Sequence, residues 1–256
     1  MRAVILAGGV GSRLSEETGQ IPKPMVEIGS RPILWHIMKI YASYGIDEFI
    51  ICLGYKGHLI KRYFADYRFF GGSVTVDLTM GKVEYHDPHP EPWRVALVDT
   101  GAETGTGGRL KAIAGLLGSE PFCMTYGDGV GDVDIRKLVA FHKSHGKLAT
   151  ITAVLPPARF GALRIADDVV TKFEEKPAAD DGWINGGFFV LDPAVLGYIG
   201  GTQTMWEQEP LRNLARDRQL AAFRHRGFWH PMDTLREKRE LDRLWREGTA
   251  PWKTWP

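Results

Sequence analysis

Residues 3–7 form a continuous apolar run, AVILA, which is closed at once by Gly8 and Gly9. An apolar run without polar alternation is typical of a strand buried on both faces, as in a parallel sheet. A sheet of that kind needs helices on both faces, so the run favours the α/β class of fold. The run is too short for the apolar core of a signal peptide, and we expect a cytoplasmic protein.

Helical and strand patterns alternate along the first half of the chain. Apolar residues recur at helical spacing between Arg31 and Tyr44, and the buried-strand pattern returns at 48–53. We therefore expect a Rossmann-like, mostly parallel sheet flanked by helices. The segment from Gly8 to Gln20 has no period and is expected to be a loop. Further strands are expected at 74–78, 94–98, 122–126 and 149–155, and further helices at 56–67, 109–117 and 135–145.

The regular alternation of strand and helix patterns ends near residue 156. Short β-like pieces follow at 162–165, 169–173 and 186–191, with helices at 195–199, 206–216 and 235–245. The chain shows no repeat, low-complexity tract or linker. We expect one domain over 1–256, in which a β-rich C-terminal elaboration (156–256) packs on an α/β part (1–155).

Charge and composition argue against several classes of protein. The chain has 32 Lys+Arg and 31 Asp+Glu, a formal net charge of +1, whereas nucleic-acid-coating proteins carry a strong basic excess. No apolar stretch approaches the length of a membrane span. Cys52 and Cys123 lie in apolar runs and are expected to be buried, reduced thiols. His36, His142 and His145 are expected at the surface or at helix caps.

The glycine-rich segment after the first strand carries the strongest functional signal. The sequence LAGGVGSRL (6–14) places Gly8, Gly9 and Gly11 within four residues. Glycine lets the backbone approach a ligand and direct consecutive N–H groups at phosphate, and Arg13 and Lys23 would add positive charge. The segment matches neither the Walker A pattern nor the dinucleotide fingerprint, whose third glycine is missing. A glycine-rich turn without a ligand is the alternative.

Two aspartates and a charged cluster complete the candidate site. Asp128 follows an expected buried strand, at the edge where open α/β sheets bind ligands. Asp233, in FWHPMDT, could instead be the N-cap of the last helix. A carboxylate, a lysine and an amide recur in FEEKP and NGGF, at Glu175, Lys176 and Asn185. There the alternative is a solvated, charged turn.

These segments resemble the signature of sugar-1-phosphate nucleotidyltransferases, through LAGGVGSRL and PKPMVEIGSRPILWHIM. The resemblance implies a nucleotide-diphospho-sugar transferase-like fold, in which 1–155 binds the nucleotide and 156–256 the sugar. It implies Mg²⁺ held by Asp128 and Asp233, and Lys23, Arg13 and Asp128 as catalytic residues. The implied nucleotide contacts are Leu6, Ala7, Gly8, Gly9, Gly11, Ser12, Arg13, Lys23, Thr104, Arg109 and Gly127. The implied sugar-phosphate contacts are Gly161, Glu175, Lys176 and Asn185.

A closer resemblance, nearly end to end, is to glucose-1-phosphate cytidylyltransferases. It is carried by LSEET, GYKGHLIKRYF, EPWRVALVDTG, TGGRLK, TYGDGV, RFGAL, INGGFFVL, WEQEPL and GFWHPMDTLR. It implies that CTP and glucose 1-phosphate give pyrophosphate and CDP-D-glucose, a precursor of dideoxy sugars in bacterial surface polysaccharides such as O-antigen. It also implies a homo-oligomer, with hexamers in the family, and neither a nucleic-acid nor a membrane partner.

Three other functions stay open at this point. The first is the same chemistry with UTP or dTTP, because the general motifs do not determine the base. The second is a regulator that binds nucleotide sugars without catalysis. The third is a dinucleotide-dependent oxidoreductase, which the missing glycine disfavours.

The C-terminal tail, PWKTWP, carries Trp252 and Trp255. Two exposed tryptophans at a free end would be costly, so we expect the tail to dock on its own subunit. The alternative is a contact between subunits, where aromatic residues are enriched.

Overall fold

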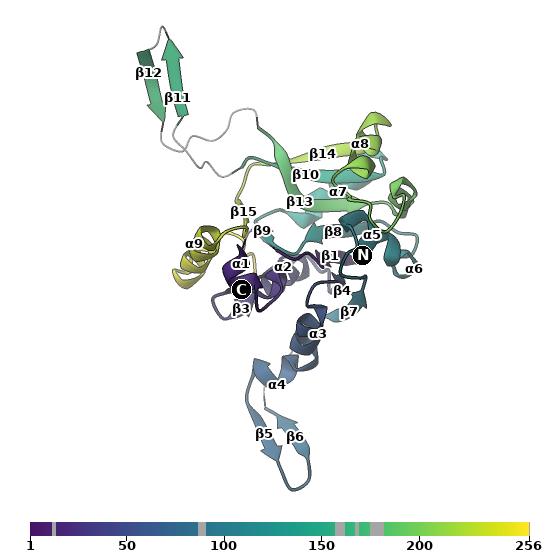
Figure 1. Ribbon diagram of the computed structural model, residues 1–256, viewed down its shortest axis with the longest axis vertical. Coiled ribbons are helices and arrows are strands. Elements are labelled where there is room, and N and C mark those ends of the chain that lie inside the picture. Colours follow the sequence, from purple (N-terminus) through teal and green to yellow (C-terminus); the bar gives the residue numbers. More distant parts are fainter. Residues whose placement is uncertain (12–13, 87–90, 157–161, 167–168, 175–181, 256) are drawn as a thin grey trace.

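The computed structural model describes residues 1–11, 14–86, 91–156, 162–166, 169–174 and 182–255. The described residues form a seven-stranded sheet in the order β14-β10-β13-β8-β1-β4-β7 (Figure 1). Parallel ladders join β1 to β4 and β8, β4 to β7, and β10 to β14. The expected α/β fold with a mostly parallel sheet is confirmed. The strands are β14 (Leu220–His225), β10 (Ala149–Val154), β13 (Ile184–Leu191), β8 (Phe122–Tyr126), β1 (Ala3–Ala7), β4 (Glu48–Leu53) and β7 (Arg94–Asp99).

Strand β13 runs against its neighbours in this sheet. It is antiparallel to β8, where Phe188 pairs with Thr125, and to β10, where Asn185 pairs with Ala153. The beginning of an antiparallel strand lies at the edge where its neighbours end. The first residues of β13 therefore lie at the same edge of the sheet as the last residues of β8.

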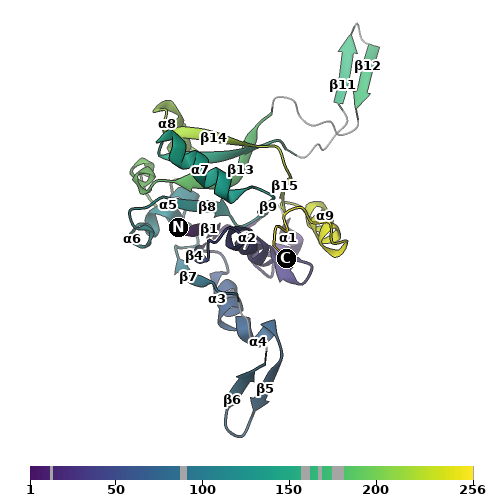
Figure 2. The same ribbon diagram turned by 180° about the vertical axis from the view of Figure 1, so that it is seen from behind.

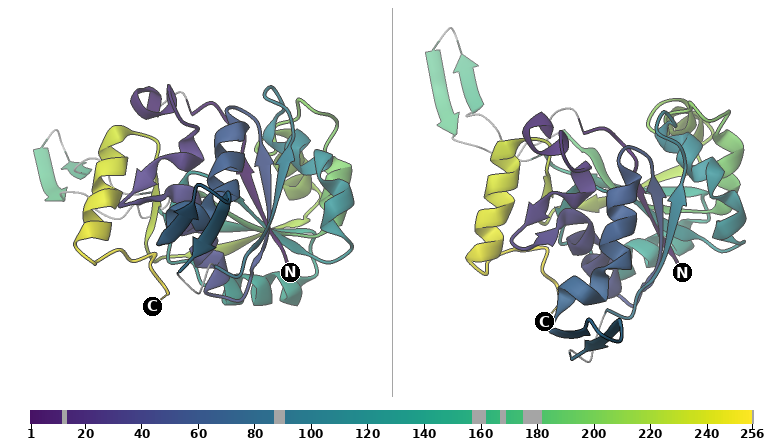
Figure 3. Two further views of the ribbon diagram at one scale, coloured as in Figure 1. Left: turned by 90° about the horizontal axis from the view of Figure 1, so that it is seen from below. Right: turned by 60° about the horizontal axis from the view of Figure 1, so that its bottom comes forward.

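The side chains of β1 alternate between two cores. Ala3, Ile5 and Ala7 belong to one core, and Val4 and Leu6 belong to the other. Burial on both faces explains the continuous apolar run, and Figure 3 shows the twisted sheet with helices on both sides. The first core also receives side chains from α2 (Ile33–Ala42), α3 (Gly57–Ala65), α7 (Ile135–His145) and α9 (Leu235–Arg246). The second receives them from α5 (Thr106–Ala112), α6 (Ala114–Leu117), η3 (Pro193–Tyr198) and α8 (Glu209–Arg216).

Several helices differ from their expected bounds. The helix expected at 109–117 is two helices, and the first of them, α5, begins earlier, at Thr106. The loop expected after β1 contains a short helix, α1 (Ser15–Thr18), and a 3-10 helix, η2 (Lys23–Met25). The piece expected at 195–199 is also a 3-10 helix, and α8 begins later than expected. A further short helix, α4 (Tyr67–Gly71), follows α3.

The C-terminal part does not form a separate layer, because β13 and β14 lie in the central sheet. The sequence did not predict β14, whose residues LAAFRH are half-buried or exposed at the edge of the sheet. The hairpins β5–β6 and β11–β12 project from opposite ends of the body (Figures 1 and 2). The smaller ladders are β2 (Glu27–Ile28) with β3 (Arg31–Pro32), β5 (Val74–Asp77) with β6 (Lys82–Tyr85), β9 (Gly129–Gly131) with β15 (Trp229–Pro231), and β11 (Ala162–Ala166) with β12 (Val169–Glu174).

The two cysteines are buried free thiols, as expected. Burial raises the pKa of Cys52 and of Cys123 to about 12. Both thiols are therefore protonated near neutral pH and serve as small core residues. Among the described residues, no helix combines the length and apolar character that a membrane span requires.

The aromatic tail packs against its own chain. Trp252 is fully buried and stacks on Phe228 and Trp245, with ring centroids 5.6 and 6.3 Å away. Trp255 is 9% exposed and meets Trp35 edge-on at 5.8 Å. The expected docking of the tail on its own subunit is confirmed.

Replacing Trp252 by alanine should lower the free energy of unfolding by about 3–5 kcal/mol, because a large buried ring is lost and a cavity remains. Urea unfolding followed by circular dichroism measures this change. The control is Lys253→Ala at the next, exposed position, which should change stability by less than about 0.5 kcal/mol. A loss below about 1 kcal/mol for Trp252→Ala would show that the tail is not part of the core.

Candidate active site

The loops that follow β1, β7 and β8 surround a cavity of about 750 Å³ at the carboxyl edge of the sheet. This is where ligands bind in open α/β sheets. Ser12, Arg13, Gly161, Glu175 and Lys176 lie outside the described residues. The other residues predicted for the site all line the cavity: Leu6, Ala7, Gly8, Gly9, Gly11, Lys23, Thr104, Arg109, Gly127, Asp128, Asn185 and Asp233.

The loop after β1 presents its backbone to the cavity. Gly9 and Val10 are exposed there, and Gly11 has a left-handed conformation with φ of 68°. The Gly11 carbonyl accepts hydrogen bonds from the Leu14 amide at 3.0 Å and from the Thr18 hydroxyl at 3.1 Å. Short helix α1 thus holds the end of the loop. The arrangement leaves the 8–11 backbone available to a ligand in the cavity, as an anion-binding loop requires.

Arg109 lies beneath the loops that form the cavity, with only 3% of its surface exposed. Burial is the main influence on its guanidinium and lowers its pKa. Its guanidinium donates hydrogen bonds to five residues of the segments around the cavity, so these contacts organise the loops there. The acceptors are the carbonyls of Gly8 (3.1 Å), Leu53 (2.9 Å), Gly101 (2.8 Å) and Ala102 (3.2 Å) and the hydroxyl of Thr100 (2.7 Å).

The glycines of the TGTGG segment allow close packing. The Gly105 amide donates to the Thr202 carbonyl at 2.8 Å, and the Gly108 amide donates to the Thr204 carbonyl at 3.1 Å. A Cβ atom on Gly108 would overlap the backbone of Thr202. The glycines of this segment therefore bring α5 against the 202–204 backbone, a packing role that the sequence alone did not reveal.

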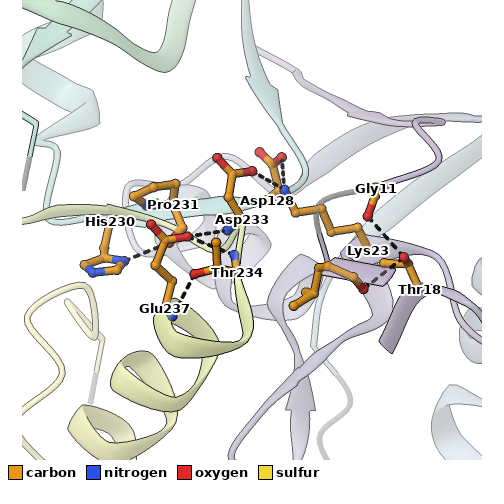
Figure 4. Close-up of polar contacts among 10 residues, drawn as sticks. Gly11, Thr18, Lys23, Asp128, His230, Pro231, Asp233, Thr234 and Glu237 are labelled. Carbon is orange, nitrogen blue, oxygen red and sulfur yellow. Dashed lines mark hydrogen bonds and ion pairs between the residues drawn. The ribbon is translucent and has the colours of Figure 1, made fainter. Parts of the chain in front are cut away.

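Lys23 reaches between two carboxylates (Figure 4). Its Nζ atom lies 2.7 Å from Asp128 Oδ2 and 2.6 Å from Asp233 Oδ1. The lysine side chain is 8% exposed, and the two aspartates are 37% and 25% exposed. Burial by itself would lower the pKa of Lys23, but the charges and hydrogen bonds of the two aspartates outweigh it and raise the pKa above its usual value. Lys23 is therefore a cation throughout the neutral range.

A small antiparallel ladder brings the two aspartates together. Asp128 lies between β8 and β9, and β9 pairs with β15, which ends just before Met232. The Met232 amide donates to the Asp128 carbonyl at 2.8 Å. Residues 128 and 233 are far apart in the chain, and this ladder places them at one site.

The N-cap of α9 is Thr234, not Asp233. The Thr234 hydroxyl accepts from the Glu237 amide at 3.3 Å, and the Glu237 carboxylate accepts from the Thr234 amide at 2.9 Å. This is a capping box, in which two free donors are satisfied reciprocally. Because Thr234 caps the helix, the carboxylate of Asp233 is directed at Lys23 instead.

The donor set at Lys23 is compatible with a divalent cation. Two carboxylates converge on one ammonium group, which stands where a metal ion would contact both. Within the described part of the chain, no group of three or more His, Cys, Asp or Glu side chains could hold a metal ion. Two carboxylates completed by water and phosphate oxygens would suit Mg²⁺, which prefers such partly open sites.

The histidines expected at the surface or at caps are instead largely structural. His36 is fully buried, with Nε2 3.0 Å from the Ile28 carbonyl, and burial lowers its pKa to about 4. His142 is also buried, with Nδ1 2.9 Å from the Thr150 hydroxyl, and only His145 is half-buried. The expectation of surface or capping positions was therefore wrong for His36 and His142, and both are core residues.

The fold and the cavity define a nucleotide-binding α/β protein, and comparison with known proteins identifies the family. The family model described as "Nucleotidyl transferase" matches residues 2–230. The chain belongs to the nucleotidyl transferase family.

Full-length relatives narrow this further. "Glucose-1-phosphate cytidylyltransferase" of Salmonella typhimurium is 57% identical over 256 residues, which cover all of both chains. "Probable glucose-1-phosphate cytidylyltransferase" of Bacillus subtilis is 46% identical, again over the whole of both chains. Among solved structures, HddC from Yersinia pseudotuberculosis has a TM-score of 0.69 at 24% identity, with 95% of this chain and 99% of that chain covered. This structural likeness concerns the fold, whereas the relatives confirm the resemblance seen in the sequence.

Two glycines of the loop after β1 form a matched pair for testing the role of Arg109. A Cβ atom at Gly8 would overlap the Arg109 guanidinium, whereas one at Gly9 would meet no heavy atom of the described residues within 4 Å. Gly8→Ala should therefore lower the free energy of unfolding by about 1–3 kcal/mol. Gly9→Ala should not lower it. Equal free energies of unfolding for the two variants, measured with urea, would contradict the close packing of the Arg109 guanidinium against Gly8.

Proposed function

We propose that this protein transfers the cytidylyl group of CTP to α-D-glucose 1-phosphate, which gives CDP-D-glucose and pyrophosphate. The observation that carries the proposal is the ammonium group of Lys23 between Asp128 and Asp233, beside the glycine loop of the cavity. The full-length relatives named glucose-1-phosphate cytidylyltransferase support the choice of base and sugar.

The reaction needs charge stabilisation and alignment. A phosphate oxygen of glucose 1-phosphate forms a bond to the α-phosphorus of CTP, and the bond from that phosphorus to the oxygen bridging to the β-phosphorus breaks. The attacking oxygen is already ionised, so no general base is required. The amides of 8–11 would bind the triphosphate, and Lys23 would stabilise charge at the α-phosphate. Arg13, outside the described residues, remains predicted for the same task.

Asp128 and Asp233 would hold Mg²⁺ in the working enzyme. The bound ion supplies charge neutralisation of the triphosphate. In the structure both carboxylates contact Lys23, which also lines the cavity. Lys23 would then exchange two carboxylate partners for phosphate oxygens.

Asn185 lines the cavity next to the proposed nucleotide site and is proposed to contact the sugar phosphate. Gly161, Glu175 and Lys176 remain predicted for the same task, as the sequence motifs imply.

We also propose a homo-oligomer, as the resemblance implies, and light scattering of the full chain would test it. The exposed apolar side chains of Phe70, Leu78 and Met80, on and near the β5–β6 hairpin, favour association between copies.

Pyrophosphate release tests the proposed reaction directly. With glucose 1-phosphate and Mg²⁺, release from CTP should be well above release from UTP, dTTP, ATP or GTP. Strong release with UTP or dTTP would keep the chemistry and overturn the choice of base. Binding of nucleotide sugar without release from any triphosphate, also with other sugar 1-phosphates, would favour a regulator without catalysis.

Metal binding tests the position of Lys23. In Lys23→Met the two carboxylates lose the cation that separates them, so Mn²⁺ alone, as a probe for Mg²⁺, should bind at least about tenfold tighter than to the wild type. Titration calorimetry without nucleotide measures this affinity. Adding Asp128→Asn to Lys23→Met should abolish the gain, with the fold of each variant checked by circular dichroism. Equal Mn²⁺ affinity of Lys23→Met and wild type would contradict a site at these two carboxylates.

A further inference from the structure

One wall of the cavity carries a row of four polar side chains, and the proposed reaction assigns a role to only one of them, Asn185. Its members are Asn185, Tyr126, Glu207 and Thr106, and all four line the cavity. They come from β13, the end of β8, the segment before α8 and the first residue of α5. This row of side chains therefore runs from the proposed sugar-phosphate side of the cavity to the 100–106 segment.

The ring of Tyr126 packs against two residues of β13. It meets Phe189 edge-on, with ring centroids 6.0 Å apart. Gly187 also contacts the ring: it has a φ of 77°, and a Cβ atom there would stand 2.8 Å from Tyr126 Cδ2. Glycine at position 187 leaves room for the ring and also adopts a backbone conformation that other residues rarely take.

The hydroxyl group of Tyr126 orients the amide of Asn185. Asn185 Oδ1 accepts from the Gly187 amide at 2.8 Å, so Nδ2 faces Tyr126 and donates to its hydroxyl oxygen at 3.3 Å. Nδ2 carries two hydrogens, and one remains for a ligand in the cavity. The direction of these bonds makes the Asn185 amide a donor toward the cavity.

Glu207 fixes the other side of the Tyr126 hydroxyl. Burial first and then the charge of the nearby Glu207 carboxylate raise the pKa of Tyr126, so its hydroxyl stays protonated and can donate. Glu207 Oε2 also accepts from the Thr106 hydroxyl at 2.6 Å. The Thr106 oxygen in turn accepts from the Trp206 amide at 2.8 Å. Hydrogen bonds thus hold Asn185 to Tyr126 and Glu207 to Thr106, and linked hydrogen bonds strengthen one another.

We propose that Tyr126 and Glu207 are positioning residues for the sugar phosphate, with Tyr126 aiming the Asn185 amide and Glu207 anchoring Tyr126 to the 100–106 segment. The inference rests on the proposed function, because it takes glucose 1-phosphate as the ligand that Asn185 meets. Neither positioning residue needs to touch the reacting phosphorus. Their loss should thus affect the sugar substrate more than the nucleotide.

Tyr126→Phe keeps the ring and removes the hydroxyl group. It should raise the KM for glucose 1-phosphate about tenfold and leave the KM for CTP within about twofold. Tyr198→Phe is the matched control: this half-buried tyrosine of η3 is not among the residues lining the cavity, so both KM values should stay at wild-type levels. A melting temperature for each variant establishes that it is folded.

Glu207→Gln tests the second member of the chain. It should raise the KM for glucose 1-phosphate less than Tyr126→Phe does, because the amide oxygen still accepts one hydrogen bond. The double variant should be no worse than Tyr126→Phe, since both changes act through the same amide. A KM for glucose 1-phosphate unchanged in Tyr126→Phe, or an equal rise in both KM values, overturns the inference while wild-type turnover upholds the proposed function. Absence of turnover by the wild type overturns both.

Discussion

The ion pairs of Lys23 with Asp128 and Asp233, at 2.7 and 2.6 Å, join three distant segments of the chain. Lys23 follows β1, Asp128 follows β8, and Asp233 precedes α9. Two partly buried carboxylates this close to one nitrogen would repel each other without a cation between them. The chain provides that cation itself, and the two ion pairs hold the segments after β1, after β8 and before α9 together. A divalent ion bound as proposed would have to compete with Lys23 for both carboxylates.

The direction of one strand decides what the site can contain. If β13 ran parallel to β8, its first residues would lie at the opposite edge of the sheet. Because β13 is antiparallel to β8 and β10, its residue Asn185 lies beside Tyr126. This is the edge of the sheet where β1 and β8 end and Gly8 and Asp128 follow. A parallel sheet alone would gather the nucleotide loops, and the reversed strand adds an amide from the C-terminal part of the chain.

The sequence predicted best those elements whose own pattern reports their burial. Strands β1, β4 and β8 have the expected bounds, because burial on both faces leaves an uninterrupted apolar run. Edge strand β14 mixes Arg224 with alanines and was missed, since half-exposed strands carry a weak pattern. Motifs found a part of the cavity lining, but they missed residues such as Tyr126 and Glu207 and did not reveal the contacts of those they found. Nothing local to Arg109 or Tyr126 indicates which distant carbonyl or carboxylate each one meets.

The same limit applies to the glycines, which serve two purposes that look alike in sequence. Gly9 and Val10 open the backbone of the first loop to the cavity, whereas Gly105 and Gly108 let α5 approach the backbone near Thr202. Segment 100–106 is therefore shaped from two sides, by Arg109 beneath it and by the 202–207 segment against it. Since residues 202–207 also include Glu207, which accepts from Thr106, the shape of segment 100–106 and the surroundings of Tyr126 depend on one packed unit. A substitution in 202–207 would therefore change the cavity wall both at segment 100–106 and near Tyr126, although none of residues 202–207 belongs to the glycine motifs.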